Sequence, residues 1–454
     1  MNSIFNDKLY PRIFFNERWY EPEEVRRQVE DFQRILDNRS SNKTPFVYLF
    51  AENNIKTLIA YLAVIRSGRV AVLLDPALRT IEIAELKEDT APGIIIRIDS
   101  STSEFNTDTE VEFTDLSIED SQREQLKDVC TVVYTAAEDG YAKGVMLTAE
   151  NLYYNALASA EASSFSPSSI SCVLLPYHHL FALQTGLLAP IVSGASIVVV
   201  DISDLRRVKG YLEIIKECNV THLYSIPVLY YLFSAVPKSA DYLKSIKFCV
   251  SGGAKLPEAI FNSFLKKTGI PLHEGYGLTE AAPVCSAMRL GDEIKIGRVG
   301  RPSLHCEIAI LDEQGNKVPV GTEGEVCVKG KNVMKGYYKH PEQTRTTLRD
   351  GWLHTGDLGI QDADGFLTLT GLKKRMLNVG GKNVYPAEVE RFLKMCPFVE
   401  NAKVYSGESR IMGDTVTADI SLNDKLDNPE EEIRNWCNKN YAAFKIPKQF
   451  NFVD

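Results

Sequence analysis

The segment HEGYGLTE, residues 273–280, brings an aromatic ring, two glycines, a hydroxyl and a carboxylate together in one short stretch. Tyr276 could stack on a nucleotide base, and Thr279 could donate a hydrogen bond to a phosphate. Glu280 could hold Mg²⁺, a hard cation that prefers oxygen ligands and accompanies phosphates in proteins. Because a purely structural turn rarely needs all three side chains, this segment predicts a site for a phosphate-bearing base.

Two further glycine-containing segments could complete such a site. SGGAKLPE, residues 251–258, places two glycines between a predicted strand and a helix that begins with proline, where the backbone can closely approach a flat ligand. GWLHTGDLG, residues 351–359, holds Asp357 in a tight glycine turn, where its carboxylate could accept hydrogen bonds from two ribose hydroxyls. A plain strand-to-helix turn and a solvated turn aspartate are the structural alternatives for these two segments.

The segment YTAAEDGYAKG, residues 134–144, contains only part of what a phosphate-binding loop needs. Thr135 and Lys143 are suitable phosphate ligands, but Glu138 and Asp139 bring negative charge to the middle of the loop. A loop carboxylate about 5 Å from a phosphate charge would repel it by about 3 kcal/mol at an effective dielectric constant of about 20. We therefore expect weaker binding of a polyphosphate here than in a loop rich in hydroxyl groups.

The elements that must position these residues alternate between helix and strand. Apolar residues follow helical spacing from Ile55 to Ile65, and VAVLLDP, residues 70–76, is typical of a buried strand. The alternation continues through IEIAELKEDT and GIII, and later through KFCVSGG and PEAIFNSFLKK. This pattern predicts parallel sheets that are covered by helices.

The pattern changes after about Gly297. HCEIAILDEQGNKV and GEVCVKG contain short strands divided by turn residues, which is typical of a small β-rich subdomain. GLKKR, residues 371–375, is the expected boundary to a last unit of about 80 residues. We predict an α/β fold in which a large N-terminal domain of two doubly wound sheets plus the β-rich subdomain, residues 1–373, is followed by a small mobile α+β C-terminal domain, residues 374–454.

The composition indicates a globular protein of several domains. The chain has 454 residues, of which 44% are hydrophobic and 24% charged, which is too long for one core and ordinary for a folded protein. The net charge of −9 and the dispersed basic residues argue against nucleic acid as the main partner. We expect no transmembrane segment and a cytoplasmic location, because no apolar stretch reaches about 18 residues and no signal-peptide pattern is present.

The nine cysteines are odd in number, widely dispersed and form no CxxC pair. This pattern is typical of a reducing compartment and predicts neither a disulfide framework nor a zinc site. We expect each cysteine to be a small buried hydrophobic residue.

Together these motifs resemble those of the AMP-forming adenylating enzymes, the superfamily of acyl-CoA synthetases, luciferases and peptide synthetase adenylation domains. The resemblance extends from about Ile55 to the end of the sequence. The matching segments are LPYHHLFAL, SGGAKLP, GYGLTE, RVGRP, GTEGEVCVKGKNVMKGYY, GWLHTGD and GLKKRMLNVGGKNVYPAEVE. The combination of GYGLTE, TGD and NVYPAEVE at these spacings is highly specific.

The resemblance implies roles for individual residues. The ring of Tyr276 and the backbone of Gly253 and Ala254 would enclose adenine, Asp357 would contact the ribose, and Glu280 would be the Mg²⁺ ligand. The residues implied to bind ATP or AMP are Thr135, Lys143, Gly253, Ala254, Gly275, Tyr276, Thr279 and Asp357. The residues implied in catalysis are Thr279, Glu280, Lys374 and His179.

The resemblance also implies a reaction in two steps. A carboxylate attacks the α-phosphate of ATP and expels pyrophosphate, and a thiol then attacks the mixed anhydride and releases AMP. Lys374 would be the hinge about which the small domain moves between two poses, and Gly381 would let the backbone lie against a pantetheine arm. The implied cofactors are ATP or AMP, Mg²⁺ and the thiol of CoA or phosphopantetheine. The implied partners are a small carboxylic acid and CoA or an acyl carrier protein.

The first functional hypothesis is an AMP-forming fatty acyl ligase. GYGLTEAAPV and NVYPAEVE resemble the fatty acyl branch, and His178 and His179 are expected to shape the acyl pocket rather than to bind a metal. Apolar residues near them could line an acyl tunnel or could simply pack in the core. These residues are Phe181, Leu183, Leu229 and Tyr230.

The second hypothesis is a non-catalytic relative that binds AMP or acyl ligands as a sensor or scaffold. It is favoured by Glu138 and Asp139, and by Leu372, which stands where the family has an arginine. The printed sequence also stops before the position of the family's catalytic lysine, and neither Lys445 nor Lys448 is expected to replace it. An enzyme that starts from the adenylate, or one that recruits a second Mg²⁺ through the two acids, lies between these hypotheses.

Overall fold

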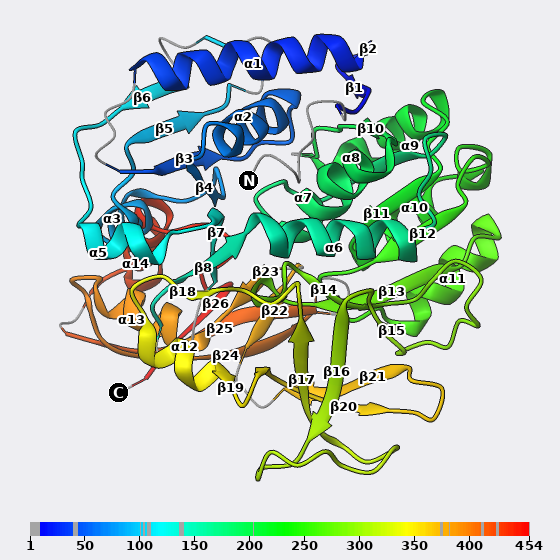
Figure 1. The fold of residues 1–454 in the computed structure, drawn as a ribbon. Coiled ribbons are helices and arrows are strands. Elements are labelled where there is room, and N and C mark those ends of the chain that lie inside the picture. The colour runs from blue at the N-terminus through cyan, green and yellow to red at the C-terminus, as the bar shows by residue number, and fades with distance from the viewer. Residues whose placement is uncertain are drawn as a thin grey trace.

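The computed structural model describes residues 10–39, 44–99, 101–102, 105–106, 110–135, 140–202, 204–372, 376–380, 382–409, 413–423 and 426–453. Within these residues the chain forms two large sheets flanked by helices, a small antiparallel sheet and a C-terminal α+β unit (Figure 1). The fold class expected from the sequence is therefore confirmed.

The first large sheet orders its described strands as β18-β8-β7-β4-β3-β5-β6. Neighbours among β3, β4, β5 and β7 run parallel, and antiparallel strands complete both edges. The strands are β3 (Phe46–Phe50), β4 (Val70–Leu74), β5 (Ile94–Arg97), β6 (Val111–Phe113), β7 (Val129–Thr135), β8 (Lys143–Thr148) and β18 (Gly336–Tyr337). The associated helices are α1 (Pro22–Arg39), α2 (Ile55–Arg66), α3 (Thr80–Thr90) and α5 (Asp120–Gln125).

Helix α2 shows how the sequence specifies the interior of this domain. The side chain of Asn54 caps the helix by accepting a hydrogen bond from the N–H of Lys56 at 2.9 Å. Every residue from 55 to 65 is buried, because a helix that is apolar on all sides must lie inside a core. The ammonium of Lys56 is also buried and pairs with the Glu110 carboxylate at 2.7 Å.

The second large sheet orders its described strands as β15-β14-β13-β12-β11-β9-β10-β1-β2. The strands from β13 to β1 run parallel. The strands are β1 (Ile13–Phe15), β2 (Arg18–Tyr20), β9 (Ile170–Val173), β10 (Ser196–Val198), β11 (His222–Ser225), β12 (Phe248–Ser251), β13 (Leu272–Gly277), β14 (Val284–Ala287) and β15 (Arg301–Pro302). The helical segments are α6 (Ala149–Ala162), α7 (Leu180–Leu183), η1 (Gln184–Leu188), α8 (Ala189–Ser193), η2 (Leu205–Arg207), α9 (Val208–Glu217), α10 (Pro227–Ala235), η3 (Ser239–Asp241), α11 (Glu258–Thr268) and η4 (Thr279–Ala281).

The remaining elements form two smaller sheets. The β-rich subdomain consists of β16 (Cys306–Leu311), β17 (Gly324–Gly330), β19 (Leu348–Arg349), β20 (Trp352–Gln361) and β21 (Leu367–Leu372), with α12 (Pro341–Thr347) beside it. The C-terminal unit consists of β22 (Leu377–Val379), β23 (Lys382–Val384), β24 (Val399–Ser409), β25 (Gly413–Leu422) and β26 (Gln449–Phe452), with α13 (Pro386–Lys394) and α14 (Pro429–Asn440). The C-terminal unit has a hydrophobic core of its own. The expected boundary between residues 373 and 374 falls outside the described residues and stays a prediction.

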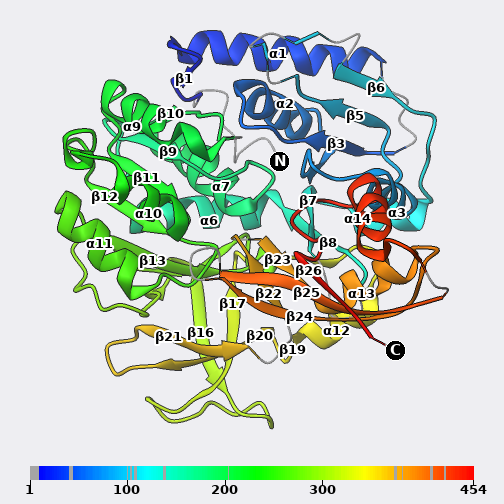
Figure 2. The same cartoon turned by 180° about the vertical axis from the view of Figure 1, so that it is seen from behind.

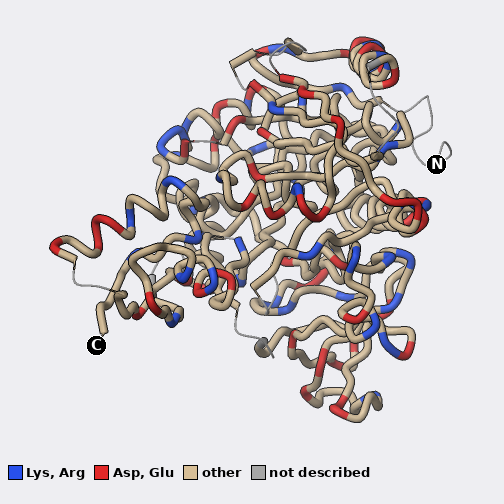
Figure 3. Tube along the Cα trace, turned by 90° about the vertical axis from the view of Figure 1, so that its left-hand side faces the viewer, with Lys and Arg blue, Asp and Glu red and all other residues tan. Residues whose placement is uncertain are grey.

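The C-terminal unit packs against the first large sheet, with α14 beside α3 in both views (Figures 1 and 2). Charged side chains line this contact. Lys445 contacts Glu388 at 2.6 Å within its own unit and Glu82 of α3 at 3.0 Å. Arg391 of α13 holds Glu85 of α3 through two hydrogen bonds of 2.6 and 2.9 Å. Elsewhere, acidic and basic residues are interspersed along the described trace (Figure 3).

Buried residues confirm some sequence expectations and favour one of two alternatives for others. All nine cysteines are free, and eight of them are buried, with Cys306 partly exposed. Leu183, Leu229 and Tyr230, expected as tunnel residues or core residues, are at most 2% exposed and belong to the hydrophobic cores, whereas Phe181 is half-buried. Core packing is therefore the alternative that the structure supports for those three residues, because neighbouring side chains enclose them. No helix among the described residues has the length and apolar character that a membrane crossing requires.

Candidate active site

The glycine turn after strand β12 exposes its backbone at the candidate site. The chain leaves β12 at Ser251, and Gly253 takes a left-handed conformation with φ of +75°, which favours glycine. At Gly252 a Cβ atom would stand 2.7 Å from the ring of Phe181, so only glycine fits beneath that ring. The glycine pair is thus needed for both conformation and close packing, as expected of a turn that approaches a flat group.

Tyr276 and Asp357 are brought together although they are far apart in sequence. Tyr276 lies at the carboxyl end of β13, and Asp357 lies on β20 of the small sheet. The tyrosine hydroxyl donates a hydrogen bond of 2.5 Å to the Asp357 carboxylate. Burial, followed by the negative charge of Asp357, raises the pKa of Tyr276 well above its usual value, so the phenol stays protonated.

Hydrogen bonds from the neighbouring strand hold Asp357 in place. Thr355 donates its hydroxyl to the Val326 carbonyl at 2.7 Å and accepts from the Asp357 N–H at 3.1 Å. The N–H of Gly356 donates to the Glu325 carboxylate at 3.2 Å. Asp357 therefore lies within strand β20, where the pairing with β17 is irregular, and not in the tight glycine turn expected from the sequence.

Glu280 and Lys143 both lie beside the aromatic side chain of Tyr337. Thr279 and Glu280 form the 3₁₀ turn η4 directly after β13, and the Tyr337 hydroxyl donates a hydrogen bond of 2.8 Å to the Glu280 carboxylate. Lys143 places its ammonium 5.8 Å from the centre of the Tyr337 ring. Burial, and then the charge of Glu280, raises the pKa of Tyr337. Tyr337 thus has a carboxylate at its hydroxyl and a cation beside its ring, and these are groups that suit Mg²⁺ and phosphate respectively.

The phosphate-loop residues are described only at the two ends of their hairpin. Thr135 ends β7 and pairs directly with Lys143, which begins β8. Residues 136–139, including Glu138 and Asp139, lie outside the described residues. Gly140 follows them with φ of +79°, and its carbonyl accepts a hydrogen bond of 3.1 Å from Arg391 of the C-terminal unit. The C-terminal unit therefore contacts the end of this loop.

His179 and His178 lie after β9, are both partly buried and stand beside Asp75 and Lys382. The Lys382 ammonium contacts the Asp75 carboxylate at 2.5 Å, and a ring nitrogen of His178 lies 3.3 Å from the same carboxylate. Burial, and then the charge of Lys382, lowers the pKa of His179 to about 4. His179 is therefore a neutral imidazole at neutral pH.

The C-terminal unit also reaches the glycine turn after β12. Asn378 of β22 donates a hydrogen bond of 2.8 Å to the carbonyl of Gly253. Strands β22 and β23 form a hairpin with Val379 opposite Lys382, as the glycine pair at 380 and 381 predicts. Lys374 and Gly381, to which the resemblance assigns a hinge and a pantetheine contact, lie outside the described residues.

Comparison with known protein families agrees with this geometry. The family model described as AMP-binding enzyme matches residues 9–338, and the model described as AMP-binding enzyme C-terminal domain matches residues 388–454. The chain belongs to the AMP-binding enzyme family. The resemblance found in the motifs is thereby confirmed, and it places the chain among AMP-forming acid–CoA ligases and their relatives.

Similar members of this family have names that specify CoA ligation. A feruloyl-CoA synthase of Amycolatopsis sp is 34% identical over 332 residues, which cover 72% of this chain and 67% of that protein. A long-chain-fatty-acid–CoA ligase of Bacillus subtilis is 34% identical over 329 residues, which cover 72% of this chain and 58% of that protein. The matched segment spans about two thirds or less of these two relatives.

The fold is shared with a solved family structure over the whole length. The o-succinylbenzoate CoA synthetase of Bacillus subtilis, solved with its product analogue OSB-NCoA, matches with a TM-score of 0.86 and 25% identity. The match covers 100% of this chain and 95% of that one. Both the large domain and the C-terminal unit therefore have counterparts in an AMP-binding family structure.

Several residues of the candidate site were not singled out from the sequence. Tyr337 lies in the quoted GTEGEVCVKGKNVMKGYY segment, Asn378 and Lys382 lie on either side of the glycine pair within two positions, and Asp75 lies near the end of the segment VAVLLDP. Each of them stands inside a motif or at the end of a predicted strand, which is the signal that could have identified it. Gly275 and Ala254 lie where expected, on β13 and in the turn after β12.

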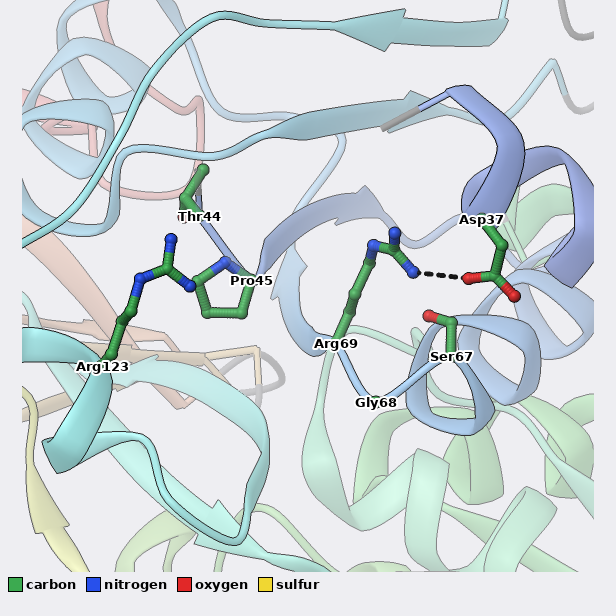
Figure 4. Close-up of a pocket in the computed structure, with 7 residues that line it drawn as sticks. All are labelled: Asp37, Thr44, Pro45, Ser67, Gly68, Arg69 and Arg123. Carbon is green, nitrogen blue, oxygen red and sulfur yellow. Dashed lines mark hydrogen bonds and ion pairs between the residues drawn. The ribbon is translucent and has the colours of Figure 1, made fainter. Parts of the chain in front are cut away.

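A separate pocket of about 320 Å³ lies at the amino ends of strands β3 and β4 of the first sheet (Figure 4). Thr44 and Pro45 precede β3, and Gly68 and Arg69 precede β4, so the pocket faces the amino ends of these strands. Arg69 is already bound to Asp37 at 2.9 Å. Because ligands of parallel α/β sheets bind at the carboxyl ends, this pocket is separate from the candidate site of the AMP-binding enzyme.

Proposed function

We propose that this protein is an AMP-forming carboxylate–thiol ligase. It would make an acyl-adenylate from ATP and a carboxylic acid and then transfer the acyl group to the thiol of CoA. Family membership supports this proposal, and the observation on which it depends is the contact between the Tyr276 hydroxyl and the Asp357 carboxylate at 2.5 Å. That contact places an aromatic ring beside a carboxylate that could accept hydrogen bonds from ribose hydroxyls, next to the backbone turn at Gly253.

The nucleotide would bind between these three groups. The ring of Tyr276 and the backbone of Gly253 and Ala254 would enclose adenine, and Asp357 would exchange its tyrosine hydrogen bond for ribose hydroxyls. Thr279 would donate to the α-phosphate, since it begins the turn that follows β13. Gly275 is needed because a Cβ atom there would stand 3.3 Å from the Ser286 carbonyl, which leaves little space for a side chain.

Glu280 would hold Mg²⁺, and Thr135 and Lys143 would contact the phosphates. A carboxylate oxygen is the type of ligand that Mg²⁺ prefers, and Tyr337 fixes the Glu280 carboxylate by a hydrogen bond of 2.8 Å. When bound, the metal would neutralise phosphate charge during attack by the carboxylate. His179, neutral because its pKa is about 4, would border the acyl group without placing a positive charge there.

The movement of the C-terminal unit about Lys374 would separate the two half-reactions. In the present arrangement Asn378 contacts Gly253, and Lys382 contacts Asp75 beside the histidines. Asn378 and Lys382 of this hairpin thus lie over the carboxyl ends of β12 and β4, one strand from each large sheet. A thiol carried by pantetheine would enter along this hairpin, where the resemblance assigns a contact to Gly381.

We propose a fatty acid as the carboxylate substrate, with CoA rather than a carrier protein as the acceptor. Both preferences remain to be tested, because the similar relatives are named for feruloyl and for long-chain fatty acyl substrates. A cytoplasmic location also stays a prediction.

The second candidate is a sensor or scaffold that binds AMP or acyl ligands without turnover. The observation in its favour is the pair Glu138 and Asp139 in the segment that resembles the phosphate loop. Like-charge repulsion of about 3 kcal/mol would weaken ATP binding by about 150-fold, while AMP, which lacks the outer phosphates, would be affected less.

Pyrophosphate exchange distinguishes the two functions. Labelled pyrophosphate should be incorporated into ATP only when a suitable acid is present, and ferulic acid, fatty acids of several lengths and o-succinylbenzoate form the test panel. Asp357→Ala should abolish the exchange, whereas Asp364→Ala, which removes an exposed aspartate beyond the same strand, should leave it unchanged. Absence of exchange with every acid, together with a Tm increase on adding AMP, would favour the sensor instead.

The role of the two acids can be tested separately. In the double variant Glu138→Thr and Asp139→Thr, ATP affinity should increase by about 10-fold or more, because repulsion is removed and two hydroxyl donors are added. AMP affinity serves as the control and should change little. Equal ATP affinity in both proteins would show that the acids lie away from the phosphates.

A further inference from the structure

A cluster of three potential metal ligands lies on the outer face of the small sheet, opposite the face that presents Asp357. Glu325 and Cys327 come from β17, and His354 comes from β20, where it is the direct cross-strand partner of Cys327. One ligand atom from each residue lies within 4.8 Å of the others. Glu325 and Cys327 are buried, and Cys327 packs with Ala309 and Leu311.

The Nδ1 atom of His354 is the point on which these groups converge. The Glu325 carboxylate lies 3.1 Å from Nδ1, and the Cys327 sulfur lies 3.3 Å from it. The guanidinium of Arg349 also lies 3.1 Å from the same nitrogen. An imidazole nitrogen has either one hydrogen or one lone pair, so it can satisfy only one of these three neighbours at a time. A cation at this point would instead be bound by the nitrogen, the sulfur and the carboxylate together.

We propose that Glu325, Cys327 and His354 form a Zn²⁺ site with a water molecule as the fourth ligand. Imidazole, thiolate and carboxylate are the ligands that zinc prefers, and binding would release the thiol proton of Cys327. A tetrahedral zinc ion separates its nitrogen and sulfur ligands by about 3.6 Å and its nitrogen and oxygen ligands by about 3.4 Å. The corresponding distances of 3.3 and 3.1 Å are within a few tenths of an ångström of these values, and the sulfur and the carboxylate oxygen lie within 4.8 Å of each other.

Arg349 competes with the metal for this position. Its guanidinium lies 3.8 Å from the Glu325 carboxylate, and its side chain is 51% exposed, so it can turn out into solvent when the cation binds. Removing its positive charge should therefore strengthen zinc binding, which distinguishes a metal site from a polar cluster that Arg349 simply completes.

The site is connected to the residue proposed to hold the ribose. The second oxygen of Glu325 accepts the hydrogen bond from the Gly356 N–H, directly before Asp357 in the chain. Zinc bound to Glu325 is therefore expected to alter AMP affinity, and this consequence alone rests on the proposed function. The metal site itself is tested without any nucleotide.

Direct metal binding to the full chain provides the test. The reduced, metal-free protein is titrated with Zn²⁺ in competition with a chromophoric chelator, and with Co²⁺ to detect a thiolate-to-cobalt charge-transfer band. The wild type should bind one zinc ion per chain at this site, and Cys327→Ser and His354→Gln should each lower its affinity by about 100-fold. Arg349→Gln should raise the affinity, and Cys306→Ser, a partly exposed cysteine on the neighbouring strand, serves as the matched control.

Two results would overturn the proposal. One is a wild-type zinc affinity that equals those of Cys327→Ser and His354→Gln, and the other is a cobalt complex without a sulfur charge-transfer band. Thermal unfolding of each metal-free variant establishes that it is folded. Arg349→Gln independently distinguishes a metal site from a structural cluster. A merely structural cluster would lose stability in this variant without gaining zinc affinity.

Discussion

Lys445 bridges Glu388 of the C-terminal unit and Glu82 of helix α3, which makes it the most informative residue of this contact to change. Its ammonium lies 2.6 Å from the Glu388 carboxylate and 3.0 Å from the Glu82 carboxylate. The three side chains are 12%, 7% and 6% exposed, so water screens them little. Burial alone would lower the pKa of Lys445, but Glu388 and then Glu82 raise it above its usual value. Lys445→Met keeps the length of the side chain and removes its charge.

The expected cost follows from the distances. At an effective dielectric constant of about 20, the attraction across 3.0 Å between Lys445 and Glu82 is about 5.5 kcal/mol. The desolvation of the lysine, which the variant no longer requires, offsets part of this loss. Leaving buried carboxylates without their cation costs about 3 to 5 kcal/mol in measured cases. We therefore expect Lys445→Met to weaken docking of the C-terminal unit by at least about 3 kcal/mol, a factor of about 150.

Hydrogen exchange of α3 and α14 peptides measures this effect, because their protection depends on docking. Exchange should accelerate by about 100-fold in Lys445→Met at pH 7, and Lys448→Met, an exposed lysine three residues later, should behave like the wild type. The variant's deficit should shrink as the pH falls, since burial raises the pKa of Glu82 and protonation removes the uncompensated charge. Equal exchange in the two variants, or a deficit that does not depend on pH, would refute this account of docking.

Three further outcomes are expected. Tyr276→Phe removes the hydrogen bond to Asp357, which should cost about 1 to 3 kcal/mol of stability while AMP affinity, measured by calorimetry, is retained or increased. His179 should show no titration near pH 6.5 by NMR, because its pKa is about 4; the folded protein should instead lose stability as the pH falls from about 6.5 towards 4, since the unfolded chain takes up that proton first. Gly252→Ala places a Cβ atom 2.7 Å from the Phe181 ring, so Tm should fall by an amount equivalent to about 1 to 3 kcal/mol and the preference among acids should shift; an unchanged Tm would contradict the packing described.

The fold class could be predicted from the sequence because its signals are local. The periodic apolar residues of α2, the buried strand β4 and the turn residues of β16 and β17 each express a preference within a few positions. The motif residues of the candidate site could be predicted for a related reason. Tyr276 lies at the end of β13, and Thr279 and Glu280 lie in the turn after it, so their closeness is a property of the chain itself.

Contacts between residues that are far apart in the sequence could not be predicted in this way. No spacing in the sequence indicates that Tyr337 bonds to Glu280, or that Asn378 bonds to the Gly253 carbonyl. The sequence predicted no zinc site because its cysteines are widely dispersed, whereas Cys327 and His354 become neighbours only through the pairing of β17 and β20. The sequence left two alternatives open for Leu229 for a similar reason, because an apolar side chain looks the same in sequence whether it lines a tunnel or fills a core.

The sequence by itself determined which chemical groups this protein has and which helices and strands hold them, because backbone conformation and amphipathic patterns act over short distances along the chain. Only the tertiary structure decided which groups share a site. Asp357 reaches Tyr276 and Lys382 reaches Asp75 through packing of sheets and domains, and these contacts join residues that are 81 and 307 positions apart in the chain.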